Sequence, residues 1–420
     1  MEAITSSLDI TPSTPLPTAC HEEFDIPSDS LAFRFEANIA AFRDNGLTVV
    51  LLSLDWFYSS PTLRARILAR CAGLLDESNL FVAASHSHTS PSTDATKVGF
   101  SKVDEAYVSS VEDAIADRVH SLLRAGDWRT VRLRFTAASC DCAVHRRRVV
   151  WRPEGRRLRR AVSFYPNPEG PRDRELRLLR VEDVAGGLLA VIWGASCHPT
   201  EWPRSRELSS DYPGGVRNAL RSHIGGEVPI LFLQGFAGDL RPPAFGHWSR
   251  RGSWIKRLLL LGSSFVNGPC FTGFSPEEYQ RWLAGIATAA CGAVDEAAKS
   301  PEMTTRLAVR RSSMPLGDVG ITCDIPALTC HSVELAESLR IVGLSAEVCW
   351  EYIGLVQRAF PGQTVWPVGY IDDVFGYLPT NTLVSEGGYE VTGFLPAFGV
   401  EGRFTADLEQ RIAALLAATT

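Results

Sequence analysis

The sequence predicts an α/β fold with a mixed, largely parallel buried sheet, or sheets, flanked by helices, and with a smaller antiparallel β region. Three observations support this prediction. Four short, continuous apolar runs are typical of strands covered on both faces, segments with helical periodicity lie between them, and one arginine-rich stretch alternates in polarity. The 420 residues allow one large domain, and we expect a single catalytic domain over 1-420 with a possible β subdomain at about 130-182.

The N-terminal part is interpreted as a strand–helix–strand unit followed by a long helix. Residues 47–54 (LTVVLLSL) and 79–84 (NLFVAA) have the apolar, β-branched composition of buried strands. Residues 60–75 between them have helical spacing, which predicts a parallel strand pair with a crossover helix. Residues 104–125 place their apolar side chains on one helical face.

Residues 131–181 differ from this pattern and are interpreted as antiparallel hairpins and loops, because short alternating runs are punctuated by Pro and Gly. The arginine runs HRRR and GRRLRR are flanked by acidic residues without interleaved aromatics, which favours a solvated or substrate-facing surface over a nucleic-acid site. Residues 188–193 (LLAVIW) and 228–233 (VPILFL) are two further buried strands, with a helix beginning near Tyr212 between them.

The C-terminal part alternates helices with irregular strands. A helix is expected over residues 275–299, where Ser and Glu three residues apart form a capping box. Residues 305–343 are strand-like, and a last helix is expected near 404–417. The apolar segment 254–266 (WIKRLLLLGSSFV) is interpreted as an ordinary buried helix, with an apolar lip for an acyl chain as the alternative.

Composition excludes several classes of protein. Charged residues make up 21% of the chain and the formal net charge is -6, so no nucleic-acid partner is expected. The N-terminus lacks the basic start and apolar run of a secretory signal, and no apolar stretch is long enough to span a bilayer. We therefore expect a cytoplasmic protein without a transmembrane segment, whose ten cysteines are mostly reduced packing residues. The oligomeric state is not predicted.

Polar residues gather where the four apolar runs end. The residues that come after these runs are Asp55, His86, His88, His198 and Asp239. Ligands of open α/β sheets bind beyond the carboxyl ends of strands, and neutral imidazole is a preferred zinc ligand. His86 and His88 are two residues apart and project to the same side of an extended segment. The pattern favours a metal site, with hydrogen-bonded histidines at a strand end as the alternative.

The GFAGD turn and the Cys197–His198 pair are interpreted as structural features and not as further catalytic sites. The turn GFAGD lacks the lysine and spacing of a phosphate-binding loop, so we expect a tight turn that lets the backbone approach the site, with Asp239 orienting other residues or capping a helix. Cys197 and His198 are adjacent and point to opposite faces of a strand, which argues against a thiol–imidazole dyad. The histidines interpreted as structural or solvated are His21, His120, His223, His247 and His331.

Sequence blocks that follow one another along nearly the whole chain identify a resemblance. They are DITP, ASHSHTSP, PNPEGPRDRELRLLRV, SCHPTE, SSDYPGG, QGFAGDLRP, VGLSAEV and GYLPTNTLVSEGGYEV. In this order the sequence resembles the N-terminal catalytic domain of the neutral/alkaline, non-lysosomal ceramidases and their shorter bacterial relatives. The resemblance implies a zinc-dependent amide hydrolase that cleaves an N-acyl bond in a ceramide-like lipid or another small-molecule amide. The C-terminal β-sandwich domain of full-length ceramidases is not expected here.

The resemblance also implies roles for individual residues. The implied zinc ligands are His86, His198, Glu347 and Tyr377. His88 matches the general base, Tyr389 matches a tyrosine at the substrate carbonyl, and Arg146 matches an arginine that contacts the substrate. Without the resemblance, Glu347 and the two tyrosines would be interpreted as packing and loop residues.

These roles combine into one mechanism. Zinc lowers the pKa of a bound water toward ~7, His88 takes the remaining proton and passes it to the leaving amine, and the metal with Tyr389 and Arg146 stabilises the oxyanion. Two alternatives remain open from the sequence. One is a metal-dependent acyl transferase or esterase in a small-molecule biosynthetic pathway, and the other is a non-catalytic binding protein on the same fold.

Overall fold

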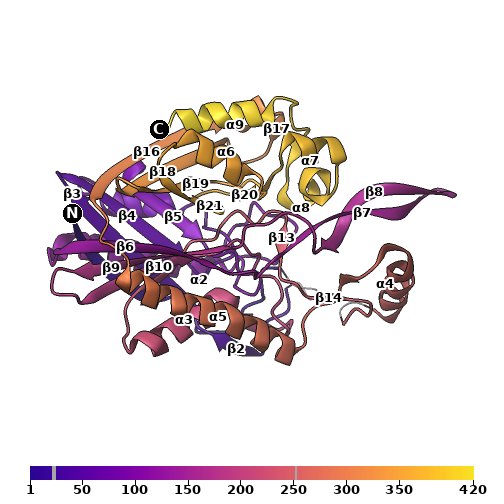
Figure 1. Ribbon diagram of the computed structural model, residues 1–420, viewed down its shortest axis with the longest axis horizontal. Coiled ribbons are helices and arrows are strands. Elements are labelled where there is room, and N and C mark those ends of the chain that lie inside the picture. The colour runs from indigo at the N-terminus through magenta and orange to yellow at the C-terminus, as the bar shows by residue number, and fades with distance from the viewer. Residues whose placement is uncertain (21–24, 251–252) are drawn as a thin grey trace.

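Two β-sheets packed face to face, with helices on both outer sides, form a four-layer arrangement (Figure 1). The computed structural model describes residues 1–20, 25–250 and 253–420. The core between the sheets is apolar, with Leu51 and Ile192 from the larger sheet beside Val333 and Ile341 from the smaller one. Each sheet therefore buries both of its faces, which explains the long apolar runs in the sequence.

The larger sheet has eight strands in the order β12-β10-β9-β6-β1-β3-β4-β5, and the smaller has four in the order β16-β18-β19-β21. The strands of the larger sheet are β1 (Glu2–Asp9), β3 (Glu36–Asp44), β4 (Leu47–Leu54), β5 (Leu80–Ala84), β6 (Arg129–Ser139), β9 (Glu175–Asp183), β10 (Leu188–Gly194) and β12 (Ile230–Phe232). Those of the smaller sheet are β16 (Thr305–Pro315), β18 (Ala327–Ala336), β19 (Leu339–Leu344) and β21 (Thr364–Val368).

Helices cover the outer face of each sheet through separate apolar cores. One half of the larger sheet is covered by α1 (Leu63–Arg70) and α2 (Glu105–Ala125), and the other half by α3 (Asp211–Ile224) and α5 (Pro276–Lys299). The smaller sheet is covered by α6 (Tyr352–Ala359) and α9 (Leu408–Ala417). The shorter helical segments are η1 (Glu77–Asn79), η2 (Leu316–Val319), α7 (Asn381–Glu386), η3 (Tyr389–Gly393) and α8 (Leu395–Phe398).

The predicted strand–helix–strand units are confirmed. Strand β4 is parallel to β5 with α1 between them in the sequence, and β10 is parallel to β12 with α3 between them. The capping box at the start of α5 is also confirmed, since the Ser275 side chain and Glu278 each accept from the other's backbone N–H. No helix among the described residues is both long and apolar enough to cross a bilayer.

The prediction of a largely parallel sheet is wrong, although the sheets are mixed as expected. Within the larger sheet only the outer pairs β4–β5 and β10–β12 are parallel, and the pairs between them are antiparallel. One of these antiparallel pairs has a local cause, since Asn45 and Gly46 have φ values of 47° and 81° in the tight turn between β3 and β4. Such a turn joins only antiparallel strands, and Asn-Gly is its sequence signal.

The arginine-rich stretch separates into two parts. Its outer strands β6 and β9 belong to the larger sheet, whereas β7 (Val144–Glu154) and β8 (Arg157–Asn167) form a hairpin that pairs with β13 (Leu240–Arg241) and projects from one end of the molecule (Figure 1). The other short strands are β2 (Ser30–Phe33), β11 (Glu207–Ser209), β14 (Phe245–Gly246), β15 (Cys270–Phe271), β17 (Ile321–Thr322), β20 (Glu347–Val348), β22 (Tyr377–Leu378) and β23 (Glu401–Gly402).

Helix α4 (Trp254–Asn267) lies at the same end of the molecule as this hairpin (Figure 1). Trp254, Leu259 and Phe265 are all strongly exposed. The interpretation of residues 254–266 as an ordinary buried helix is therefore wrong. An apolar helical pattern does not reveal whether another element covers it.

Candidate metal centre

Four side chains from distant parts of the sequence converge where strands of both sheets end. His86 and His88 follow β5, His198 follows β10, and Glu347 begins β20. The backbone of His86 has a φ of 64°, an uncommon value for a residue other than glycine. Its N–H nevertheless donates to Trp56 O at 3.0 Å, so the fold holds the strained position at the strand end.

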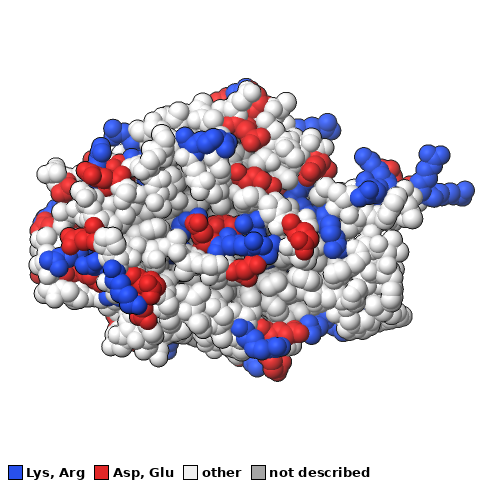
Figure 2. Space-filling view, in the orientation of Figure 1, with Lys and Arg blue, Asp and Glu red and all other residues white. Residues whose placement is uncertain are grey.

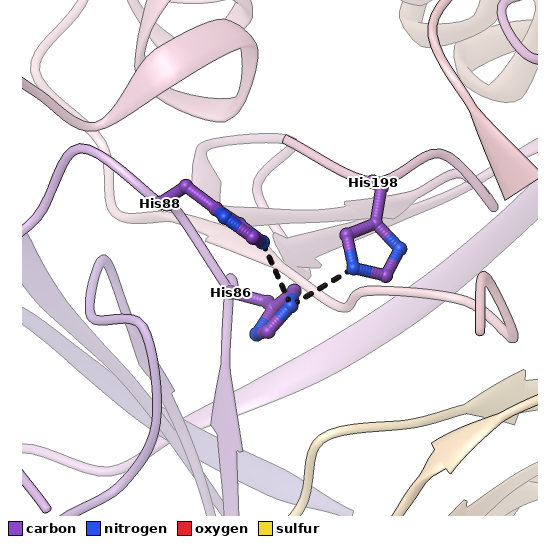
Figure 3. Close-up of side chains that lie close together, drawn as sticks. All are labelled: His86, His88 and His198. Carbon is purple, nitrogen blue, oxygen red and sulfur yellow. Dashed lines mark hydrogen bonds between the residues drawn. The ribbon is translucent and has the colours of Figure 1, made fainter. Parts of the chain in front are cut away.

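The donor atoms of these side chains are spaced as ligands of one ion would be. His86 Nε2 lies 3.0 Å from His198 Nε2 and 3.2 Å from His88 Nε2. Glu347 Oε2 lies 3.5 Å from His86 Nε2 and 3.2 Å from His198 Nε2. Ligands of a tetrahedral zinc at ~2.0–2.1 Å stand about 3.3 Å apart. Figure 3 shows the three imidazoles pointing toward a common point.

Hydrogen bonds on the far side of two imidazoles fix their tautomers. His86 Nδ1 lies 3.1 Å from Phe57 O, and His198 Nδ1 lies 2.8 Å from Ala237 O. A carbonyl oxygen only accepts, so both Nδ1 atoms carry protons and both Nε2 atoms of the neutral rings are bare acceptors. Two bare acceptors and a carboxylate oxygen then face one another, an arrangement that a cation between them satisfies. Such carbonyl contacts are the usual support of metal-binding histidines.

Protonation of the imidazoles does not supply this positive charge near neutral pH. Burial lowers the pKa of His86 to about 3, and burial followed by the nearby Arg146 lowers the pKa of His198 well below its ordinary value. His86, His198 and Glu347 are each 1% exposed. Neutral imidazoles with a carboxylate form a donor set that suits zinc, so the residues present fit the ion that the sequence implies.

The remaining predicted residues surround these donors. Tyr377 lies opposite Glu347 in the parallel pair β20–β22. The guanidinium of Arg146 lies 5.2 Å from the Tyr377 ring centre and 5.6 Å from that of Tyr389. Tyr389 begins the π-helical segment η3 and is 36% exposed, which places it at the rim of the site. The structure thus brings all the predicted residues to one region, with the three histidines and Glu347 in direct contact.

Known proteins match this chain in structure but not in sequence. No protein-family model matches the chain, and no curated protein matches it. Among solved structures, a neutral ceramidase from Pseudomonas aeruginosa superposes with a TM-score of 0.72 at 15% identity, covering 99% of this chain and 74% of that one. A ceramidase complexed with C2 gives a TM-score of 0.72 at 14% identity, with the same coverage.

The chain has a neutral ceramidase-like fold. At these identities the similarity establishes the fold alone. The roles of individual residues in this ceramidase-like chain therefore rest on the contacts that its own side chains make.

Two further tyrosines, Tyr58 and Tyr370, contact the Glu347 carboxylate. The sequence did not predict them as site residues. Tyr58 OH donates to Glu347 Oε1 at 2.5 Å, and Tyr370 OH donates to Glu347 Oε2 at 3.4 Å. The Tyr370 ring also stacks on His86 with a centroid separation of 4.3 Å. Both tyrosines come shortly after strands, β4 and β21, so the strand-end pattern that identified the histidines extends to them.

The GFAGD turn brings backbone close to the site, as predicted. Ala237 supplies the carbonyl that holds His198, and a Cβ on Gly238 would lie 2.5 Å from Glu347 O. Only glycine permits that approach. Cys197 Sγ donates to Cys142 O at 3.4 Å rather than to an imidazole, in agreement with the argument against a thiol dyad.

A second group of metal-capable residues consists of His145, the chain neighbour of Arg146, with Asp239 and Glu351. His145 Nε2 is 3.2 Å from Asp239 Oδ2, and Trp350 N–H donates to Asp239 Oδ1 at 2.9 Å. Burial and the neighbouring Asp239 raise the pKa of Glu351 above its ordinary value. The Arg146 backbone N–H donates to Asp239 O at 2.9 Å, so the group is joined to the arginine through the main chain.

Other polar residues singled out by the sequence have structural partners. Asp55 forms a buried ion pair with Arg217 and accepts from Glu36 N–H. His223 contacts Asp295, His247 contacts Ser264, and His331 contacts the Ser78 carbonyl. His21 lies outside the described residues.

Proposed function

We propose that the protein is a zinc-dependent amide hydrolase that cleaves an N-acyl bond. The observation that carries this proposal is the pair of bare Nε2 atoms of His86 and His198, which face each other at 3.0 Å beside the Glu347 carboxylate. That arrangement supports a bound metal ion. The ceramidase-like fold supports amide hydrolysis as the reaction served by the ion.

The zinc ligands in this proposal are His86, His198, Glu347 and Tyr377. A bound zinc ion supplies a hydroxide nucleophile near neutral pH and polarises the substrate carbonyl. Tyr58 holds the Glu347 carboxylate in place through its short hydrogen bond. Burial raises the pKa of Tyr377 well above its ordinary value, so this phenol needs a neighbouring cation to ionise.

His88 is the proposed general base. It is only partly buried, unlike His86 and His198, and its Nε2 lies 3.2 Å from His86 Nε2. In this position it can take a proton from the attacking nucleophile and deliver the proton to the leaving nitrogen, which must be protonated before the C–N bond breaks. A partly buried imidazole such as His88 can contact both the nucleophile and the substrate, as this proton transfer requires.

Arg146 and Tyr389 are proposed to bind the carbonyl oxygen as negative charge develops on it. Although burial opposes the charged form of Arg146, the neighbouring Tyr377 and Glu390 raise its pKa well above the ordinary value, so the guanidinium stays charged. Its Nε donates to Glu390 at 2.8 Å, and its buried Nη2 has no hydrogen-bond partner among the described residues. Such a fixed donor stabilises an oxyanion more than a solvated one does.

The proposed substrate is a ceramide-like lipid or another small-molecule amide, and the proposed compartment is the cytoplasm, where the ten free cysteines would stay reduced. Aromatic side chains at the rim, Phe164 and Tyr389 with ring centres 6.1 Å apart, offer an apolar contact for an acyl chain.

The direct test is to incubate zinc-loaded protein with N-acyl sphingosine and with short N-acyl amines, and to measure the free amine released. We expect release from at least one class, and loss of that release after chelation of zinc and its recovery when zinc is restored. The proposal is contradicted if neither class of amide releases amine, or if chelation leaves the rate unchanged.

A further inference from the structure

Helix α4 presents an apolar face that no other element covers in the described part of the chain. Its exposed large side chains are Trp254, Ile255, Leu258, Leu259, Phe265 and Val266. They recur in adjacent pairs four and seven residues apart, which places them on one side of the helix. Phe265 is 81% exposed, and Trp254 and Leu259 are each 70% exposed. A continuous apolar face of this kind marks an interaction surface.

Polar contacts with the β7–β8 hairpin hold α4 in this orientation. Ser263 Oγ lies 2.8 Å from Tyr165 OH on β8. Asn267 at the end of α4 exchanges two hydrogen bonds with the backbone of Trp151, of 2.8 and 3.1 Å. These contacts use the polar side of the helix, so the apolar side faces outward beside the hairpin.

The hairpin tip next to α4 is strongly basic. Between residues 151 and 160 it carries five arginines, Arg152, Arg156, Arg157, Arg159 and Arg160, and a single acid, Glu154. All residues of this tip are exposed, and Figure 2 shows the basic side chains on the projecting end of the molecule. Arg152 and Arg159 are direct cross-strand partners, a like-charge pairing that costs stability. Since the whole chain has a net charge of -6, this positive charge is local.

The same hairpin reaches the candidate metal centre at its other end. Phe164 on β8 lies 5.0 Å from the Arg146 guanidinium and 6.1 Å from the Tyr389 ring. The exposed apolar helix, the basic tip and the rim of the site are therefore parts of one continuous end of the molecule, as Figure 1 shows for their elements.

We propose that α4 and the tip of the β7–β8 hairpin dock the protein on an anionic lipid bilayer. The apolar face of α4 enters the boundary between headgroups and acyl chains, and the arginines bind lipid phosphates and carboxylates. A second copy of this chain is a poorer occupant, because an isologous contact would bring the two arginine-rich tips together. This inference goes beyond the proposed hydrolysis and is tested by binding alone.

The test is co-sedimentation of the full chain with phosphatidylcholine vesicles that contain or lack phosphatidylserine. We expect binding to the anionic vesicles only, and weaker binding as salt rises, because salt screens the arginines. The double variant Leu259→Ser/Phe265→Ser should lower the affinity roughly tenfold or more, since each buried methylene contributes to insertion. Val184→Ser is the matched control, because Val184 is also exposed but lies in the turn after β9. Arg152→Gln/Arg159→Gln should remove the preference for anionic vesicles.

Three results would overturn the proposal. The first is no sedimentation of the wild-type chain with anionic vesicles, and the second is binding that neither double variant changes. The third is a wild-type dimer that Leu259→Ser/Phe265→Ser converts to a monomer without any vesicle binding in either form, which would make a second copy the occupant. The variant His86→Ala should bind vesicles like the wild type, so a failure of hydrolysis and a failure of docking give different results.

Discussion

The candidate metal centre and the α4–hairpin end differ most in how completely their side chains are covered. His86, His198 and Glu347 are almost fully buried and are fixed by backbone carbonyls or buried phenols, whereas Phe265 on α4 is 81% exposed. The ends of buried strands thus fix the reactive groups, whereas the outward face of α4 leaves its apolar area open, which suits the contact with another surface proposed above. Substitutions on the covered side should therefore change chemistry or stability far more than those on the open side.

The largest effect is expected when the buried metal centre loses one of its ligand atoms. His86→Ala removes one of the two facing Nε2 atoms, so the ion and amide hydrolysis should both be lost. Elemental analysis and the amine-release assay measure the two effects. His120→Ala on α2 is the control and should keep both. Retention of a full equivalent of zinc by His86→Ala would break the proposed ligand set.

His88→Ala should separate chemistry from metal binding. We expect kcat to fall by about 10²–10⁴, the usual contribution of a general base, while the zinc content stays at the wild-type level. If zinc is lost as well, His88 is a ligand and not a base.

Tyr389→Phe probes the rim, where the covered and open regions meet. Loss of one oxyanion donor should lower kcat by about 10²–10³ with little change in KM, because the hydrogen bond strengthens only as charge develops. Steady-state kinetics with the best amide substrate provides the measurement. An increase in KM at constant kcat would instead assign Tyr389 to ground-state binding.

Tyr58→Phe tests the support of the carboxylate ligand. Without the 2.5 Å hydrogen bond to Glu347 Oε1, zinc affinity should weaken by roughly 10–100-fold, as for other groups that orient ligands. Competition with a chelator measures the affinity. Tyr165→Phe is the matched control, since its hydroxyl contacts Ser263 on α4. Equal zinc affinities in the two variants would show that the Tyr58 hydroxyl does not support zinc binding.

Two glycines provide the smallest and sharpest contrast between the regions. Gly238→Ala should destabilise the fold by ~1–3 kcal/mol, since its Cβ would lie 2.5 Å from Glu347 O. Gly262→Ala on α4 should stabilise by up to ~1 kcal/mol, because its Cβ would meet nothing within 4 Å and alanine favours a helix. Denaturant unfolding measures both. Shifts of the same sign would argue against the difference in packing.

The sequence predicted the parts of the fold that local pattern determines. Apolar runs located β4, β5, β10 and β12, and the polar residues after them located the histidines of the site. The predicted parallel direction was wrong, because apolar runs do not indicate how neighbouring strands are oriented, and the Asn45–Gly46 turn indicates an antiparallel pair for β3 and β4 alone.

Contacts between residues far apart in the chain could not be predicted from local sequence pattern. Tyr58 and Glu347 are 289 positions apart, and only the packing of the two sheets brings them to 2.5 Å. The exposure of α4 could not be predicted either, because its apolar pattern suits a buried helix equally well. Assignment of Glu347, Tyr377 and Tyr389 to the site depended on the family resemblance rather than on their own spacing.

The central claim is that one ion joins His86, His198 and Glu347. Anomalous scattering from crystals of zinc-loaded protein, measured at the zinc absorption edge, tests this most directly. We predict one strong peak about 2.0–2.2 Å from both Nε2 atoms and from a carboxylate oxygen of Glu347. No peak between these side chains, or a single peak at His145, Asp239 and Glu351 instead, would contradict it.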